Sequence, residues 1–425
     1  MHYIRLMRPP SLDKQQLKLV LTVTTDLGDS FLCPERPVPI SVYLTGYGFN
    51  RGETVFLTPR RNHKSETYWK EGMRVLKLDL RVPDKAFRII KTLPHPERPY
   101  IEIVASHHPE DPPRVARIPF DRKGRVLALA VLWPLDKEES FECERHIAIN
   151  TEFVLRVSER IGESIDRHVW DAGVVTMCLF FSILEDLSSE HLWDRTPLLK
   201  ELLCAATPQH PINAIELGCG VGILGVGLAQ ALSRRIISLW TPLGPLTIPS
   251  KILLTDLPDA EEVAAWNIDD EKMARVEVSG VPTVEAEFES LDWDEGKTGV
   301  FGPKARALSW DLIIISDCTY NVDMLPALVK TISGLHRLSM DKDKDKKSPR
   351  VMLATKPRHS SEKALFGLMD EDGWKILESA SQPLPVLGME DEVVEIYLFG
   401  KDDELEQSHD EGASTASAPK RRKLR

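Results

Sequence analysis

The sequence has few of the features that mark secreted, membrane or metal-binding proteins. Its six cysteines are scattered over 425 residues with no C-x-x-C pair, which argues against a disulfide framework and a zinc site, and no metal is expected. The first residues contain no apolar segment long enough for a secretory signal. The most apolar run, 217–232, is too short to span a bilayer. We therefore expect an intracellular protein with no membrane contact.

Positive charge is also in short supply. The chain has 54 Lys and Arg against 65 Asp and Glu, a formal net charge of -11, so most of its surface should repel nucleic-acid phosphates. Direct nucleic-acid binding is therefore not expected. The exception is the end of the chain, where "PKRRKLR" resembles a short nuclear-import signal and implies an import carrier as a partner. We expect a cytoplasmic location, a nuclear location or both.

The pattern of apolar residues divides the chain into three parts. Residues 1–147 contain short strand-like runs with alternating apolar positions, which indicates a β-rich N-terminal module. Residues 148–401 alternate strand-like and helix-like segments, which is typical of an α/β, Rossmann-like doubly wound sheet. Residues 402–425 are acidic and then basic, and we expect this tail to be disordered. In the second part, strands are predicted at 212–217, 251–257, 283–288, 311–317, 350–356 and 392–399.

Four glycines cluster in "AIELGCGVGILG", at the turn that follows the first of these strands. Gly220, Gly222 and Gly225 fit the G-x-G-x-x-G pattern of dinucleotide-binding loops, a weak match on its own. Glu216, two residues before Gly218, disfavours a pyrophosphate, whereas it suits a cofactor that carries an ammonium and a sulfonium. We expect Gly218, Gly220 and Gly222 to face the cofactor, and Gly225 to pack a helix against the sheet.

A further acidic residue, Asp256, ends the next predicted strand in "KILLTDL". A carboxylate at this place can accept hydrogen bonds from both ribose hydroxyls of an adenosine cofactor. The distance from the glycines exceeds the usual twenty or so residues, because a proline-rich insertion at 240–250 intervenes. The order of the elements still fits such a site.

These residues resemble the class I S-adenosylmethionine-dependent methyltransferases. More narrowly, they look like the protein lysine methyltransferases that modify chaperones, AAA ATPases and translation factors. The resemblance covers roughly residues 150–400 and implies a seven-stranded methyltransferase sheet, S-adenosylmethionine as cofactor, and methyl transfer to a lysine of a protein substrate. It is carried by "HVWDAG" (168–173), "ELGCGVG" (216–222), "TDLP" (255–258) and "SDCTYN" (316–321).

The resemblance also assigns roles to particular residues. Trp170 is placed beside the methionine part of the cofactor, where a sulfonium over the indole would be a cation-π contact. Asp292 and Trp293, in "LDW", are placed beside the adenine. Asp317 and Tyr320 match the family's D-x-x-Y motif and are the predicted catalytic residues. Asp317 would border the cofactor and orient the substrate ammonium, while Tyr320 would shape an aromatic slot.

Other functions stay open at this stage. A scaffold could keep the fold without catalysis, and the Gly220 to Gly225 spacing alone would suit an NAD-dependent oxidoreductase. A methyltransferase of another substrate is a further alternative, but "DCTY" lacks the asparagine and prolines of the N-P-P-Y motif used on amides and base nitrogens. Near the substrate entrance the family often has a basic pair and an aromatic residue, here Lys356, Arg358 and Phe366.

Overall fold

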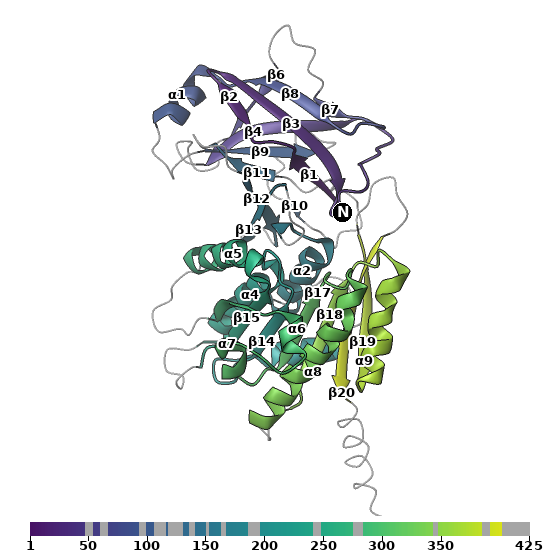
Figure 1. Ribbon diagram of the computed structural model, residues 1–425. Coiled ribbons are helices and arrows are strands. Elements are labelled where there is room, and N and C mark those ends of the chain that lie inside the picture. Colours follow the sequence, from purple (N-terminus) through teal and green to yellow (C-terminus); the bar gives the residue numbers. More distant parts are fainter. Residues whose placement is uncertain are drawn as a thin grey trace, which may run out of the picture.

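Three β-sheets organise the described part of the chain, two in the N-terminal part and one in the C-terminal part (Figure 1). The predicted tail at 402–425, with its basic end, lies outside this part. The computed structural model describes residues 1–46, 54–59, 67–92, 99–105, 116–117, 131–135, 141–149, 153–162, 167–185, 196–240, 248–274, 284–342, 347–384 and 392–401.

The N-terminal part is a sandwich of two mainly antiparallel sheets. Leu19 of one sheet and Val42 and Ile103 of the other belong to one shared core, because alternate residues of each strand point inward. The first sheet has the order β1-β3-β8-β6, and β2 pairs with β3; its strands are β1 (His2–Leu6), β2 (Ser11–Asp13), β3 (Gln16–Thr25), β6 (Thr58–Pro59) and β8 (Leu76–Arg81). Helix α1 (Asp84–Thr92) follows β8. The second sheet has the order β10-β12-β11-β9-β4-β5, with β7 on β4 and β13 on β12; its strands are β4 (Val38–Gly46), β5 (Val55–Phe56), β7 (Tyr68–Trp69), β9 (Pro99–Ala105), β10 (Ala116–Arg117), β11 (Val131–Pro134), β12 (Glu142–Ala148) and β13 (Val154–Arg160).

The second sheet extends beyond the predicted boundary between residues 147 and 148. Strand β13 pairs with β12 along its whole length, from Arg160 opposite Glu142 to Val154 opposite Ala148. The predicted boundary thus falls between two strands that pair with each other. The buried residues Leu155 and Val157 of β13 belong to the core of the C-terminal part, and Ser158 bonds to Asn267 of the helix at Glu261–Ala274, so β13 joins the second sheet to the α/β part.

The C-terminal part is a doubly wound, seven-stranded sheet with the order β16-β15-β14-β17-β18-β20-β19. All neighbours pair in parallel except at β20, which is antiparallel to both β18 and β19. This confirms the predicted α/β fold class, although β19 was not among the strands predicted by range. The strands are β14 (Asn213–Leu217), β15 (Lys251–Asp256), β16 (Glu285–Ser290), β17 (Leu312–Ser316), β18 (Arg350–Thr355), β19 (Trp374–Pro383) and β20 (Val393–Lys401).

Helices cover both faces of this sheet, which explains why its central strands are apolar at nearly every position. Ala214 and Ile314 belong to the core under α2 to α5, while Ile215 and Ile313 belong to the core under α7, α8 and α9. None of the helices in the described part is both long and apolar enough to cross a membrane. The helices are α2 (Asp171–Glu185), α3 (Pro197–Cys204), α4 (Ile223–Leu239), α5 (Glu261–Ala274), α6 (Trp293–Gly296), α7 (Pro303–Ala307), α8 (Leu325–Lys342) and α9 (Ala364–Glu371).

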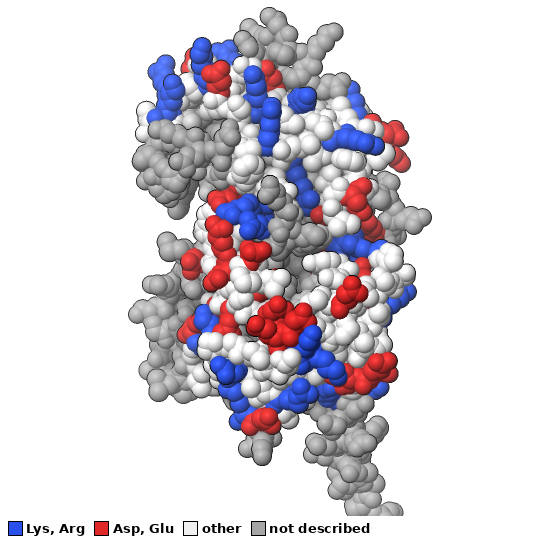
Figure 2. Space-filling view, in the orientation of Figure 1, with Lys and Arg blue, Asp and Glu red and all other residues white. Residues whose placement is uncertain are grey.

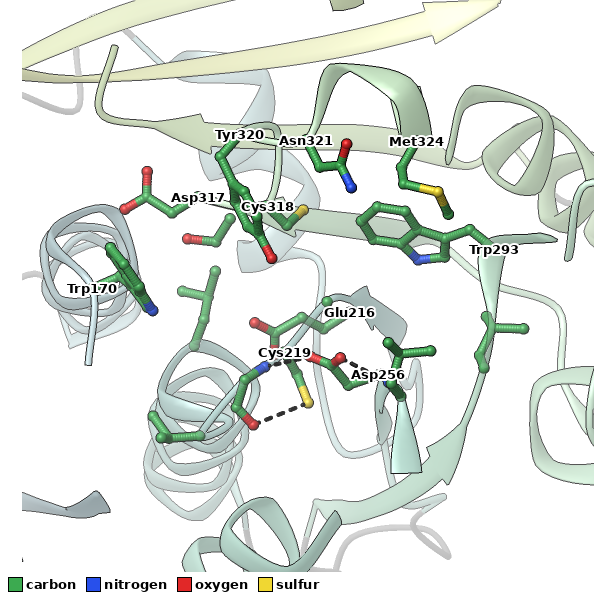
Figure 3. A pocket seen from close by; sticks show the side chains of 18 of the residues that line it. Trp170, Glu216, Cys219, Asp256, Trp293, Asp317, Cys318, Tyr320, Asn321 and Met324 are labelled. Atoms are coloured by element: carbon green, nitrogen blue, oxygen red, sulfur yellow. Dashed lines mark hydrogen bonds between the residues drawn. The ribbon is translucent and has the colours of Figure 1, made fainter. Parts of the chain in front are cut away.

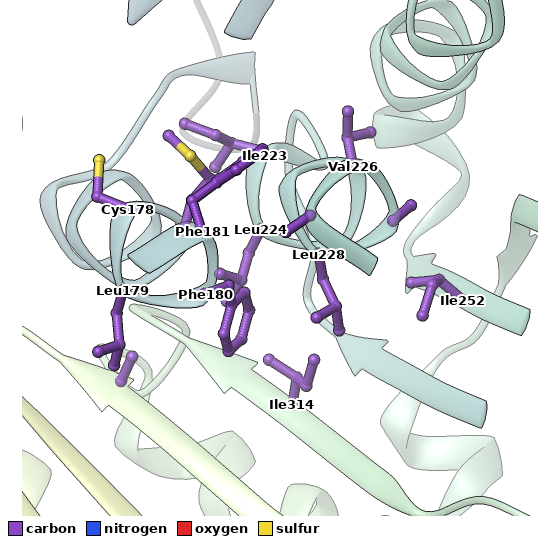
Figure 4. Close-up of a cluster of buried hydrophobic side chains, with 14 of the residues drawn as sticks. Cys178, Leu179, Phe180, Phe181, Ile223, Leu224, Val226, Leu228, Ile252 and Ile314 are labelled. Atoms are coloured by element: carbon purple, nitrogen blue, oxygen red, sulfur yellow. The ribbon is translucent and has the colours of Figure 1, made fainter. Parts of the chain in front are cut away.

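Helices α2 and α4 pack closely side by side on one face of the sheet (Figure 4). Phe180 and Phe181 of α2 are fully buried, as is Leu228 of α4. A Cβ on Gly227 would lie 2.2 Å from Cγ of Met177, so glycine at this position allows the two helices to approach. The packing fixes the first residues of α2 and α4 relative to each other, and both lie at the site described next.

Candidate active site

The predicted site residues gather at the carboxyl ends of the central strands. Strands β14 and β17 are neighbours, and the chain leaves them toward opposite edges of the sheet, which is the arrangement that opens a ligand crevice in such folds. A cavity of about 350 Å³ lies there (Figure 3), within the range typical of small-molecule sites. It is lined by nine of the predicted residues: Trp170, Glu216, Gly218, Gly220, Asp256, Asp292, Trp293, Asp317 and Tyr320.

The glycine turn between β14 and α4 forms one wall of the cavity. Gly218 and Gly220 have φ values of 70° and 53°, in the left-handed region that favours glycine. At Gly218 a side chain would also collide, because its Cβ would lie 3.0 Å from Cβ of Cys318 and 3.3 Å from the ring of Trp293. The backbone of this turn therefore comes close to the cavity.

Gly222 is not among the residues that line the cavity, unlike Gly218 and Gly220. It is the N-cap of α4 with φ of 79°, and a Cβ there would lie 2.6 Å from Cδ2 of Leu254. Its role is the turn and the close packing of helix on sheet. Gly225 has the packing role expected for it, because a Cβ would lie 2.7 Å from both Glu216 Oε2 and Leu254 Cγ.

Glu216 is buried at the end of β14, where one of its oxygens also borders Gly225. Its Oε2 accepts a hydrogen bond from the backbone N–H of Gly225 at 2.9 Å. Burial raises the pKa of Glu216 to about 8, although the hydrogen bond from Gly225 acts in the other direction. A positively charged group of a ligand placed beside this side chain would favour its ionised form.

The raised pKa makes the cofactor-free protein less stable at high pH. The contribution of Glu216 to stability is fully present below its unfolded pKa of 4.5 and is lost as the pH rises toward about 8, at about 1.4 kcal/mol per pKa unit. Glu216→Gln removes this titration and keeps an oxygen for Gly225. From pH 5 to pH 8.5 the free energy of unfolding should fall in both proteins. We expect the fall to be smaller in the variant, by on the order of 3 kcal/mol.

Urea unfolding across this pH range measures the difference. Glu295→Gln, which changes an exposed acid of α6, serves as the matched control and should follow the wild-type curve. Parallel curves for wild type and Glu216→Gln would show that the buried carboxyl does not titrate as described.

Asp256 ends β15 at the opposite side of the glycine turn. Its Oδ2 accepts a hydrogen bond from the N–H of Gly220 at 2.8 Å, and its Oδ1 accepts one from the N–H of Leu257 at 2.7 Å. The carboxylate therefore ties the second strand to the glycine turn while it lines the cavity (Figure 3).

Asp292 and Trp293 lie at the start of α6. The side chain of Asp292 caps this helix, because its Oδ1 accepts a hydrogen bond from the N–H of Asp294 at 2.8 Å. The Trp293 indole stands beside Gly218 and close to Met324 in Figure 3. Together they form an aromatic and acidic wall, which is the arrangement expected for an adenine subsite.

The carboxylate of Asp317 is fully hydrogen-bonded to other segments of the protein. It has φ of 49°, unusual for a residue other than glycine, and it directly follows β17. Its Oδ1 accepts from the N–H of Lys356 and from Nη1 of Arg358, both at 2.9 Å. Its Oδ2 accepts from the N–H of Ala172 at 3.0 Å and from Nη2 of Arg358 at 3.2 Å. A carboxylate has about four acceptor positions, and all four are occupied.

This geometry argues against the predicted role of Asp317 as the ligand of the substrate ammonium. To accept a hydrogen bond from a lysine, the carboxylate would have to give up Arg358 or a backbone N–H. The sequence motif correctly indicates that Asp317 borders the cavity, but the structure makes it a partner of Arg358.

Tyr320 is the most exposed of the predicted residues, with 59% of its surface accessible. Figure 3 shows its ring at the edge of the cavity with the hydroxyl directed inward. The preceding residue, Thr319, ties this segment to the helical turn at Ser360–Lys363, because its hydroxyl donates a hydrogen bond to Oε2 of Glu362 at 3.3 Å. Tyr320 is therefore placed to contact a group that enters the cavity from solvent.

Three residues predicted near the substrate entrance do not line the cavity; they are Lys356, Arg358 and Phe366. Lys356 is only 5% exposed, and its Nζ lies 3.0 Å from Oδ2 of Asp171. The guanidinium of Arg358 lies over the Trp170 ring, 5.2 Å from its centroid. Phe366 packs edge-on against Tyr397, with the ring centroids 4.8 Å apart. The first two belong to a buried ion-pair network beside the cavity, and Phe366 belongs to the core.

Sequence reasoning did not assign several residues of the cavity wall. Ser316 is the clearest of them, because it lines the cavity and its hydroxyl is buried with no hydrogen-bond partner among the described residues. It stands directly before Asp317 in the same motif, which could have singled it out. Other unassigned lining residues are His168, Gly173, Cys219, Val221, Ile223, Leu224, Leu257, Leu291, Asp294, Cys318, Asn321 and Met324.

The cavity fits S-adenosylmethionine in size and chemistry. The residues predicted to contact the ribose, the adenine and the sulfonium all line the cavity; they are Asp256, Asp292, Trp293 and Trp170. The hydroxyl of Ser316, which has no partner within the described part of the chain, supplies a polar group that a ligand could satisfy. One face of the Trp170 indole is taken by Arg358, so a sulfonium would need the other face.

Comparison with known protein families gives a match over about half of the chain. A family model described as lysine methyltransferase matches residues 149–372. Among curated proteins, the chain is 27% identical over 208 residues to the UPF0665 family protein C23C4.06c of Schizosaccharomyces pombe, and the match covers 49% of this chain. The chain spans about half the length of this relative, at 47%.

Solved structures similar to the chain include two S-adenosylmethionine-dependent methyltransferases. The one from Methanosarcina mazei is 12% identical and covers 48% of this chain and 97% of its own, with a TM-score of 0.31. The one from Clostridium acetobutylicum is 9% identical and covers 54% and 99%, with a TM-score of 0.30. P. horikoshii TYW2 in complex with MeSAdo is 11% identical and covers 60% and 71%, with a TM-score of 0.30.

Proposed function

The chain belongs to the lysine methyltransferase family, and from this premise we propose that it transfers the methyl group of S-adenosylmethionine to a lysine side chain of a protein. The family match supports a methyltransferase activity that uses S-adenosylmethionine. The lysine acceptor and the protein substrate are the parts proposed here. They rest mainly on the exposed ring of Tyr320, which stands at the edge of the cavity where the chain leaves β17.

The charges around the cavity support a cationic acceptor. Asp292 and Asp294 both line it, and the side chain of Asp294 is 56% exposed. Figure 2 shows acidic side chains gathered on this face in the region of α6. A protonated lysine would be attracted to such a surface, whereas the phosphates of a nucleic acid would be repelled.

The acceptor must lose its proton before it can attack a methyl group, since the pKa of a free lysine is about 10.4. Trp170, Tyr320 and Met324 line the cavity with largely apolar surface, and transfer into such surroundings disfavours the charged form. Because the four acceptor positions of Asp317 are occupied, we assign it no proton transfer. We propose that the proton leaves to solvent at the open edge beside Tyr320.

S-adenosylmethionine supplies an electrophilic methyl group on its sulfonium. The contribution of the chain is to align the acceptor nitrogen with that methyl group and to exclude water, and alignment of this kind lowers a barrier without any covalent help from the protein. Tyr320 would hold the stem of the lysine, and the glycine turn with Asp256 would hold the cofactor. These roles divide acceptor binding from cofactor binding, and the division can be tested.

The test combines substrate discovery with two variants of Tyr320. Purified protein is incubated with labelled S-adenosylmethionine and an extract from cells that lack it, and the labelled protein and residue are identified by mass spectrometry. Tyr320→Phe keeps the ring and should retain most of the activity, whereas Tyr320→Ala should lower kcat/KM about 100-fold with an unchanged cofactor Kd, as expected for loss of about 2.7 kcal/mol of transition-state stabilisation. Label on a residue other than lysine would contradict the proposed acceptor.

A further inference from the structure

Asp26 of the N-terminal sandwich contacts residues that lie directly behind the wall of the cavity. Asp26 directly follows β3, and its side chain is 1% exposed. Its Oδ2 accepts a hydrogen bond from Nη2 of Arg358 at 2.6 Å and one from the N–H of Asp171, the first residue of α2, at 3.2 Å. Its Oδ1 lies 3.5 Å from Nζ of Lys356. Two segments of the C-terminal part, the start of α2 and the chain that follows β18, thus converge on one carboxylate from the N-terminal part.

Arg358, which bonds to Asp26, also contacts two residues that line the cavity. Both terminal nitrogens of Arg358 donate hydrogen bonds to the carboxylate of Asp317. Its guanidinium lies over the Trp170 ring, 5.2 Å from the ring centroid, and both Asp317 and Trp170 line the cavity. A planar guanidinium that meets two carboxylates and a ring has one orientation that satisfies all three partners. Asp26 supplies one of the three, so its removal would free Arg358 to turn.

The N-terminal sandwich makes a second contact of the same kind. The hydroxyl of Tyr3, on β1, donates to Oδ1 of Asp171 at 2.6 Å. Figure 1 shows β1 on the side of the sandwich that faces the seven-stranded sheet. The first turn of α2, which follows Trp170, is therefore held by both Asp26 and Tyr3.

The charge on Asp26 is stable because of its partners. Burial alone would raise its pKa, but the cations of Arg358 and Lys356 outweigh burial and hold the pKa at about 2. The carboxylate is thus ionised across the physiological range. A buried ion-pair network with satisfied partners is rigid, and losing one member leaves the others uncompensated.

We propose that Asp26 is a positioning residue for methyl transfer, through which the N-terminal sandwich holds Arg358 and thereby orients Trp170 and the segment from Asp317 to Tyr320. The proposal rests on the proposed function, because Trp170 and Tyr320 are the residues assigned there to the sulfonium and to the acceptor. It gives the β-rich part of the chain a role in the reaction that is separate from binding a partner.

The kinetic test uses Asp26→Asn, with Asp29→Asn as the matched control. Asp29 is exposed on the same loop and pairs only with Thr25 among the contacts described here, so its change should leave kcat within twofold. Asp26→Asn should lower kcat at least tenfold, while KM for the protein substrate and the cofactor Kd from calorimetry stay within about threefold. A kcat within twofold of wild type, or an equal loss of cofactor affinity, would overturn the proposal.

Hydrogen exchange tests the same idea without methyl transfer. In Asp26→Asn, amides in peptides covering 168–173 and 317–321 should exchange at least tenfold faster, while those of α4 keep wild-type rates. If the wild type transfers no methyl group, the proposed function is wrong. The exchange measurement would still show whether Asp26 holds these two segments in place. If Asp26→Asn does not fold, Arg358→Lys, which keeps the charge but loses the fork, takes its place, and unchanged exchange there would overturn the proposal.

Discussion

Asp256→Ala is expected to weaken the binding of S-adenosylmethionine by about 100-fold or more. The carboxylate lines the cavity at the tip of β15, and we assign it both ribose hydroxyls of the cofactor. Hydrogen bonds to a charged group contribute about 1.5–3 kcal/mol each, and 1.4 kcal/mol is a factor of ten in Kd. The substitution also releases the N–H groups of Gly220 and Leu257, which loosens the glycine turn. Calorimetry with the purified protein measures the effect.

Asp259→Ala is the matched control for this experiment. Asp259 is an exposed acid of the short helical turn that follows β15, three residues from Asp256, and it does not line the cavity. Its loss should leave the Kd within about twofold, because an exposed charge contributes little. If Asp256→Ala bound the cofactor as tightly as this control, the assignment of the ribose to Asp256 would be wrong.

The cofactor side of the site could be predicted from the sequence because its residues act locally. Glu216, Gly218 and Gly220 lie within five positions of one another, on a strand and the turn that follows it. Asp256 ends the next strand, and parallel strands place their carboxyl ends at one edge of a sheet. Strand order and turn geometry are therefore enough to bring these residues together. Neither requires knowledge of any packing between distant segments.

The remaining features depend on contacts that no local pattern contains. Gly222 satisfies the same glycine spacing as Gly220, but Leu254 of the neighbouring strand stands where its side chain would be. The network around Arg358 joins residues that are 332 positions apart in the case of Asp26. A motif shows that Asp317 follows a buried strand, but only the folded chain shows that a cation already occupies its carboxylate. The sequence therefore predicts where Asp317 lies better than what it does.

Asp317→Asn is expected to lower the free energy of unfolding by about 3–5 kcal/mol, the usual cost of removing one partner from a buried ion pair. Asparagine tolerates the left-handed backbone of this position, so the loss reports the missing charge and not backbone strain. Arg358 would remain with Asp26 as its one described carboxylate partner. The double variant Asp317→Asn, Arg358→Gln should lose about 2 kcal/mol less free energy of unfolding than the sum of the losses in the two single variants. The reason is that the second change removes the uncompensated cation.

Urea unfolding and steady-state kinetics together separate this role from direct binding of the substrate. Asp323→Ala, an exposed acid in the short helix after Tyr320, should change the free energy of unfolding by less than about 0.5 kcal/mol. If Asp317 held the substrate ammonium, Asp317→Asn would raise KM for the protein substrate and leave stability near wild type. The four hydrogen bonds to its carboxylate predict the reverse, a large loss of stability with a fall in kcat, because the segment that carries Tyr320 begins at Asp317.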